Sequence, residues 1–158
     1  MNRSLFFRLI PRWASVLAIW LLLAGPAWCA DAGEEAMRIR AVLIWATNDP
    51  KPAGAKLKDL DDKVRKRLRA VFKWKDYYEV ERKVFPIEPG KKIRLSDECE
   101  VTARHISGST VEFSLYGKGK KVVTKTHVMD PGELLVLAGE AVNDTAWFVT
   151  LTRAGDKE

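Results

Sequence analysis

The most restrictive feature of this sequence is a series of short β-type segments that fills the chain from residue 77 to residue 152. Apolar and polar residues alternate over residues 99–105 and 111–116, which is the two-residue period of strands with one buried face. Turn residues such as Pro89-Gly90 and Pro131-Gly132 separate the segments. No helical pattern lies between these later segments, so crossover helices and a parallel sheet are not expected. Short strands with close turns predict an antiparallel β-sandwich or a partly open barrel.

One helix and one central strand come before this series. Residues 37–46 begin in alternation and then become wholly apolar, which predicts a central strand. Residues 57–72 place apolar side chains on a single stripe, with acids early and bases late, and predict an amphipathic helix that docks on the sheet. The remaining strands are expected at residues 77–85, 92–95, 99–105, 111–116, 121–129, 134–138 and 146–152.

We therefore expect a single β-rich domain over residues 37–152, preceded by a flexible lead at 33–36 and followed by a polar tail at 153–158. This length suffices for one domain with a hydrophobic core. Large aromatic residues are expected to build either this core or aromatic surface patches. The candidates for these roles are Trp45, Trp74, Phe113, Trp147 and Phe148.

The first 32 residues have the order of a secretory signal peptide. Three arginines precede an uncharged apolar run at residues 14–24, and Gly25-Pro26 ends this run. The small-x-small rule for cleavage is satisfied after Cys29 and after Ala32. The apolar run is short for a bilayer span, which needs about 20 residues, and retention as an uncleaved anchor is the alternative. We expect export to a periplasmic or extracellular location.

Cleavage at either position would leave Cys99 as the only cysteine. An intramolecular disulfide is then impossible, and the exported domain depends on its core for stability. We expect Cys99 to be buried and inert. The whole chain carries a formal net charge of +6, and the mature chain stays mildly basic, which suggests a weak affinity for anionic surfaces.

The clearest functional feature is a basic stretch that ends among aromatic residues. Residues 63–75 contain no acid. Positive charge beside aromatic rings suits a polyanion such as an anionic lipid, lipopolysaccharide or an acidic glycan, while export argues against nucleic acid. The alternative is that these residues form the solvated outer face of an amphipathic helix. The candidate binding residues are Lys63, Arg65, Lys66, Arg67, Arg69, Lys73, Trp74, Lys75 and Tyr77.

No pattern of catalytic or metal-binding residues accompanies this stretch. His105 and His127 are the only histidines, whereas a zinc site needs three or four ligands. The acids at residues 59–62, 79–81 and 97–100 offer no spaced pair for glycoside hydrolysis. Lysines surround Gly117 and Gly119, which favours a hairpin over a phosphate loop. We therefore predict no catalytic residue, no metal site and no cofactor.

Two stretches together resemble a known type of protein. The first is Phe72-Lys73-Trp74-Lys75-Asp76-Tyr77-Tyr78, and the second runs from Gly132-Glu133-Leu134-Leu135 to Ala146-Trp147-Phe148-Val149. They resemble a recurring type of small exported bacterial protein of unassigned function. The resemblance covers about residues 60–151 and implies a bacterial source and a periplasmic or envelope location. It carries over no catalytic residue.

These observations predict a non-enzymatic binding or interaction module of the bacterial envelope. A protein partner or an anionic surface would contact the basic face, and the membrane itself would be involved only if the signal segment stays uncleaved. Charge reversal at Arg65, Arg67 and Arg69 is then expected to weaken binding without unfolding the domain. Two alternatives stay open: a hydrolase of cell-wall or glycan material that uses two carboxylates in a pocket, and an accessory subunit whose exposed strand edge pairs with a partner.

Overall fold

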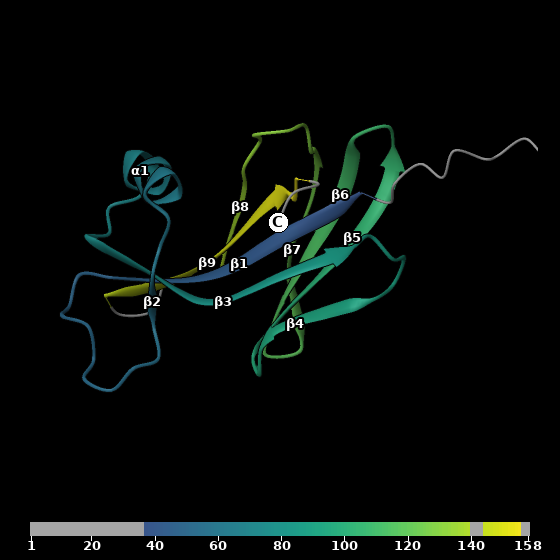
Figure 1. The fold of residues 1–158 in the computed structure, drawn as a ribbon. Coiled ribbons are helices and arrows are strands. Elements are labelled where there is room, and N and C mark those ends of the chain that lie inside the picture. The colour runs from purple at the N-terminus through teal and green to yellow at the C-terminus, as the bar shows by residue number, and fades with distance from the viewer. Residues whose placement is uncertain (1–36, 140–143, 156–158) are drawn as a thin grey trace, which may run out of the picture. The chain divides into compact units, whose positions relative to one another are not determined.

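β1 (Arg38–Thr47) is the central strand of a five-stranded antiparallel sheet (Figure 1). The order across this sheet is β2 (Lys58–Asp59), β3 (Asp76–Pro86), β1, β9 (Thr145–Arg153) and β8 (Leu135–Ala138). A four-stranded antiparallel sheet has the order β4 (Lys92–Ser96), β5 (Cys99–Ser107), β6 (Thr110–Gly117) and β7 (Lys120–Val128). This structure is a computed structural model that describes residues 37–139 and 144–155, and α1 (Asp62–Val71) is the one helix in these residues.

The two sheets share one hydrophobic core. β1 contributes Ile39 and Leu43, and β6 contributes Val111, Phe113 and Leu115, all of them buried. The alternation seen in the sequence therefore directs the apolar residues of both sheets toward one another, as in sandwich folds. This arrangement confirms the predicted fold class, which is a mainly β domain of antiparallel sheets with one amphipathic helix. The described strands do not close into a barrel.

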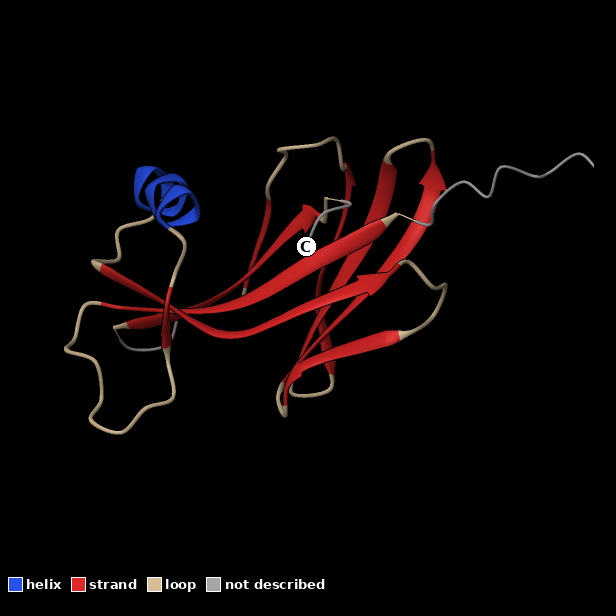
Figure 2. Cartoon of the chain, viewed as in Figure 1, coloured by secondary structure: helices blue, strands red, loops and turns tan. Residues whose placement is uncertain are grey.

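The opposite face of the five-stranded sheet carries α1 (Figure 2). Leu68 of α1 is 1% exposed and belongs to a second apolar cluster with Ile44 of β1, Tyr77 of β3 and Phe148 of β9. Phe72, at the end of the helix, packs on Phe148 with ring centroids 4.5 Å apart. The central strands are therefore buried on both faces, which explains why residues 41–46 are apolar without alternation.

The helix begins five residues later than the sequence pattern predicts. Lys58 and Asp59 form β2, which pairs with β3, and Asp61 is the cap whose Oδ1 accepts a hydrogen bond from the Lys63 N–H at 2.9 Å. Leu60 is nevertheless 4% exposed and lies in the same cluster as Leu68. The apolar stripe thus continues through a strand and a cap, and its spacing alone does not mark where the helix starts.

The turn between β6 and β7 is the hairpin predicted from its glycines and lysines. Lys118 and Gly119 both have positive φ, at 50° and 76°. Two such central residues form the tight turn whose twist matches that of the flanking strands. Glycine at the second position adopts this conformation without a steric cost.

β7 is an edge strand with features that discourage further pairing. Lys125 and His127 lie opposite Phe113 and Val111, on the side of the strand that faces the core. A register shift between Leu115 and Tyr116 also makes the β6–β7 ladder irregular. Inward-facing charges and bulges are devices that protect sheet edges from association, so β7 gives little support to the strand-edge alternative.

The predicted aromatic contributors fall into two groups. Trp74, Phe113 and Phe148 are at most 6% exposed and belong to the two apolar clusters. Trp45 and Trp147 lie directly opposite one another on β1 and β9, and Trp147 is 47% exposed. These last two residues form a surface patch at one end of the five-stranded sheet.

Several sequence predictions concern residues outside the described part of the chain. These are the signal peptide at 1–32, the lead at 33–36 and the last residues of the tail, 156–158. β9 continues to Arg153, and the Ala154 N–H donates to the Arg38 carbonyl at 2.9 Å, so the tail starts later than predicted. Within residues 37–139 and 144–155, no helix combines the length and the hydropathy needed to cross a bilayer.

Candidate functional site

A hollow of about 260 Å³ lies beside the start of α1, on the helix side of the five-stranded sheet. We call it the α1 groove. It exists because α1 covers only part of this sheet face: Ile44 and Ala46 of β1 lie in the cluster with the helix, whereas the face continues at the other end of β1 through Val42 to Arg40. The groove is lined by Arg40, Val42, Leu60, Asp61, Lys63, Val64, Arg82, Thr150 and Thr152.

The groove gathers cations from three separate elements. Arg40 comes from β1, Arg82 from β3 and Lys63 from α1. β1 and β3 are paired neighbours, with Val42 directly opposite Arg82. Charges that converge from different elements are held by the fold rather than by one flexible segment, and they raise the local positive potential of a concave surface.

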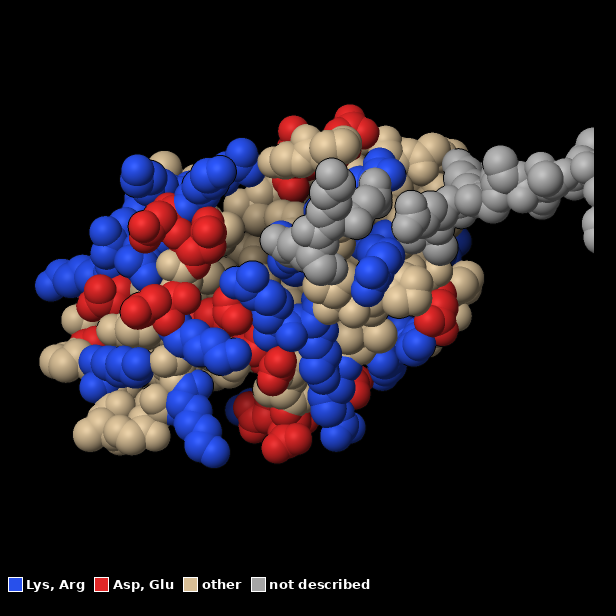
Figure 3. Space-filling view, in the orientation of Figure 1, with Lys and Arg blue, Asp and Glu red and all other residues tan. Residues whose placement is uncertain are grey.

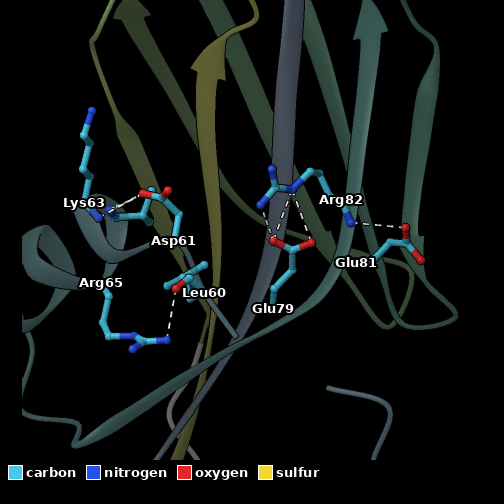
Figure 4. A network of polar contacts seen from close by, with 8 residues as sticks. Leu60, Asp61, Lys63, Arg65, Glu79, Glu81 and Arg82 are labelled. Atoms are coloured by element: carbon cyan, nitrogen blue, oxygen red, sulfur yellow. Dashed lines mark hydrogen bonds and ion pairs between the residues drawn. The ribbon is translucent and has the colours of Figure 1, made fainter. Parts of the chain in front are cut away.

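Arg82 is oriented by a buried carboxylate. Glu79 is 4% exposed, and its two oxygens accept hydrogen bonds from the Arg82 guanidinium, including Nε to Oε2 at 3.2 Å and Nη2 to Oε2 at 2.5 Å (Figure 4). A buried charge of this kind needs a partner, because its desolvation costs several kcal/mol. The pair therefore fixes the position of Arg82 at the wall of the groove.

The acid at the start of α1 is also engaged. Asp61 Oδ1 accepts from the backbone N–H groups of Lys63 and Val64, at 2.9 and 3.3 Å (Figure 4). This contact satisfies two of the donors that every helix leaves open at its first turn. Lys63 lies in the same turn and also lines the groove, while Asp61 occupies the backbone donors of Lys63 and Val64.

Thr150 supplies a polar group at the floor of the groove. The residue is 2% exposed and lies directly opposite Val42 on the neighbouring strand. Thr152 lies opposite Arg40 in the same register and adds a second hydroxyl on this face.

The arginines of the predicted binding face contact the domain's own backbone. The guanidinium of Arg65 donates to the Leu60 carbonyl at 3.0 Å, that of Arg67 to Gly132 at 3.2 Å and that of Arg69 to Lys75 at 2.6 Å. These bonds tie α1 to the segments around it. Charge reversal at the three arginines would therefore disturb the docking of the helix, so a binding test needs other residues.

The lysines of the predicted face remain exposed. Lys63, Lys66, Lys73 and Lys75 are all solvent-accessible, and Figure 3 shows Lys and Arg gathered over α1 on the left of the view, with acidic side chains between them. Lys73 also lies over the ring of Trp74, with its Nζ 5.3 Å from the centroid. Four of the predicted cations are thus exposed on α1 or just after it, and we call these four lysines the lysine face.

The two predicted aromatic residues are not part of this surface. Trp74 is 6% exposed and Tyr77 is 2% exposed, and both belong to the apolar cluster under α1. The Tyr77 hydroxyl donates to the Phe72 carbonyl at 3.4 Å, and burial raises the pKa of this phenol. The prediction that Trp74 and Tyr77 lie on the binding face is therefore wrong. They are buried because aromatic residues that follow this amphipathic helix fill the space where the helix meets the sheet.

Two other candidate residues from the sequence have no role in the groove. Burial, with a smaller contribution from Glu100, raises the pKa of the Cys99 thiol to about 11, so the thiolate is scarce at neutral pH. His127 lies 4.0 Å from Glu133, and no group of three metal-ligating side chains occurs within residues 37–139 and 144–155.

Sequence reasoning missed most of the groove. Arg40, Arg82, Thr150 and Thr152 lie on three strands that are far apart in the sequence, and only the sheet order brings them together. The sequence signal that points to the groove is the alternation of Arg38 and Arg40 with apolar residues at the start of β1, which places both arginines on one face of the strand. A scan against protein-family models and searches of curated proteins and of solved structures found no match.

Proposed function

We propose that the mature domain is an exported, non-enzymatic binding module that docks on an anionic surface of the bacterial envelope. The observation that carries this proposal is that two groups of cations, the lysine face and the lining of the α1 groove, meet at α1. The lysine face lies on and just after α1, and the α1 groove lies at the start of the same helix. Lys63 belongs to both surfaces, so a single approach of an anionic surface engages both.

Electrostatics favours this mode of binding. A lysine near an anionic membrane surface contributes about 1 kcal/mol, and the attraction falls off within a Debye length of roughly 8 Å at physiological ionic strength. Four exposed lysines on one helix and the segment after it therefore give useful affinity only when they face the surface together. The arginine contacts support this arrangement, because they hold α1 and its lysines against the segments around the helix.

The geometry gives less support to the hydrolase alternative. A hydrolase of this kind needs two carboxylates in a pocket that are free to act on the substrate. The acids at the α1 groove are engaged instead, Asp61 with the helix N-terminus and Glu79 with Arg82. A protein partner would use the same lysine face and is one outcome of the test below.

Co-sedimentation with lipid vesicles tests the proposal. The chain from Gly33 onward is mixed with vesicles of phosphatidylglycerol and phosphatidylcholine, and in parallel with vesicles of phosphatidylcholine alone. We expect binding to the anionic vesicles that weakens as salt is added. The double variant Lys66→Glu with Lys75→Glu should lower the affinity by more than about tenfold. Neither residue lines the groove, so this variant tests the lysine face by itself.

The matched control is Lys120→Glu with Lys121→Glu. It changes the net charge by the same amount on β7, a strand of the other sheet, at two exposed lysines. The proposal predicts that this control binds like the unaltered chain. Equal losses of affinity in both variants would show that binding depends on net charge and not on the lysine face. Unchanged binding of the Lys66 and Lys75 variant at low salt would exclude the lysine face as the contact.

A further inference from the structure

We propose that the α1 groove holds the phosphate of a lipid headgroup, with Arg40, Lys63 and Arg82 around it and Thr150 beneath it. This inference rests on the proposed function, since it names the chemical group that the envelope surface would place in the groove. It concerns residues other than those of the lysine face, apart from Lys63. The two ideas can therefore fail separately.

The charge of the groove favours a single anion. Three cations line it against one lining acid, Asp61, and one buried acid beside it, Glu79. Asp61 contacts the helix backbone and Glu79 contacts Arg82. The three cations still outnumber these two acids, so the net charge at the groove is positive. A phosphate near Arg40, Lys63 and Arg82 offsets this charge, and charge-assisted hydrogen bonds to it are about twice as strong as neutral ones.

The donors of the groove fit a phosphate better than a carboxylate. A planar carboxylate is satisfied by one guanidinium in a two-point contact. The groove instead presents cationic donors from β1, β3 and α1, and a hydroxyl from Thr150 on β9. A tetrahedral group with several acceptor oxygens makes use of donors that come from different directions. Thr150 lines the groove as a buried residue, and its hydroxyl is one of these donors.

The size and lining of the groove leave room for more than the phosphate. Its volume of about 260 Å³ is several times the roughly 30 Å³ that one water occupies in the liquid. Val42, Leu60 and Val64 provide an apolar part of the wall beside the cations. A phosphodiester that carries a glycerol backbone matches both parts, whereas inorganic phosphate would use only the cationic part.

Nuclear magnetic resonance with a soluble headgroup tests this inference. The ¹⁵N-labelled chain from Gly33 onward is titrated with glycerol 3-phosphate, and separately with acetate at the same ionic strength. We expect saturable shifts at the amides of Arg40, Lys63 and Thr150 with the phosphate, and much weaker ones with acetate. Thr150→Val should weaken the phosphate affinity about tenfold, because it removes one hydrogen bond to a charged group while keeping the side-chain shape.

The control variant is Thr126→Val, which removes an exposed hydroxyl from a strand of the other sheet and should leave the affinity unchanged. Absence of saturable shifts in the groove, or equal affinity of the Thr150→Val chain, would overturn the inference. Equal affinity for acetate would overturn the choice of phosphate. The same variants are then tested on the anionic vesicles. Phosphate binding without vesicle binding would identify a soluble phosphate ester and refute both the lipid source and the proposed function, whereas vesicle binding unaffected by Thr150→Val would refute only the groove.

Discussion

The helix-side face of the five-stranded sheet has two halves that differ in composition. At one half, Ile44 and Phe148 pack under Leu68 of α1 and water is excluded. At the other half, the same face of the same strands carries Arg40 and Thr152, and the surface is hollow. Both halves are built by the two-residue period of β1 and β9, so the difference comes from residue type and not from backbone geometry.

Under the proposed function, this difference separates the residues that stabilise the fold from the candidate binding residues within one sheet. The covered half removes apolar area from water at about 25 cal/mol per Å², which stabilises the fold. The open half keeps charged groups at a concave surface, where they raise the local positive potential. Substitutions in the covered half are therefore expected to change the free energy of unfolding, and those in the open half to change binding.

The largest effect on stability is expected at Leu68. Leu68→Ala should lower the free energy of unfolding by about 2–5 kcal/mol, because it leaves a cavity between α1 and the sheet. Val71 is 75% exposed on the same helix, and Val71→Ala is the matched control with a change below about 0.5 kcal/mol. Urea denaturation followed by circular dichroism measures both. Similar values for the two variants would show that α1 does not dock as described.

The next effect is expected where the two halves meet, at the ion pair of Glu79 and Arg82. Arg82→Gln should cost about 1–3 kcal/mol, because it leaves the buried Glu79 carboxylate without its charged partner. The double variant Glu79→Gln with Arg82→Gln should lose less than Arg82→Gln does. Lys91→Gln breaks an exposed pair with Glu88 and should cost well below 1 kcal/mol. An equal cost for Arg82→Gln and Lys91→Gln would mean that Glu79 is not buried in solution.

A smaller effect is expected at the cap of α1. Asp61→Ala removes the acceptor of two backbone hydrogen bonds and should lower the free energy of unfolding by about 1 kcal/mol. Asp62→Ala alters the neighbouring exposed acid, which pairs with Arg65 at 3.5 Å, and should cost about half as much or less. Thermal unfolding of both variants makes the comparison, and a larger loss for Asp62→Ala would place the helix start elsewhere.

The smallest effect is expected at Cys99 of β5, which lies in the four-stranded sheet. The reactivity of its thiol shows whether substitutions in the groove disturb the rest of the domain. Because its pKa is about 11 instead of the ordinary 9.0, alkylation at pH 8 should be about a hundredfold slower than for a free thiol. Substitutions in the groove should leave this rate unchanged. The raised pKa also means that stability falls as the pH rises from about 9 to about 11, since the unfolded chain loses the thiol proton first.

The sequence carries enough local information to predict the sheet elements but not the groove. Alternation and turn residues mark β3 to β9 closely because each signal lies within a few neighbouring residues. The start of α1 was harder to predict, because Leu60 continues the apolar stripe although it precedes the cap. The pairing of β1 with β9 joins residues about a hundred positions apart, and it leaves no local signal that Thr150 and Arg40 line the same hollow.

The roles of the basic residues around α1 also could not be predicted from the sequence. The sequence indicates that residues 63–75 are basic, but it does not distinguish cations that hold the fold from cations that are free to bind. Arg65 and Arg69 turn back to carbonyl groups nearby in the chain, and Arg67 reaches Gly132. The position of a carbonyl group depends on tertiary structure, so only Lys63, Lys66, Lys73 and Lys75 remain as candidate contact residues once the fold is known.

The most direct test of the account is photo-cross-linking in living cells from a reactive residue placed at position 66 on α1, compared with the same residue at position 120 on β7. The account predicts an adduct with phospholipid at position 66 and none at position 120. A discrete protein adduct at position 66 would replace the anionic surface by a protein partner. Equal lipid adducts at both positions, or lipid at position 120 alone, would contradict the claim that the α1 side of the domain is its binding surface.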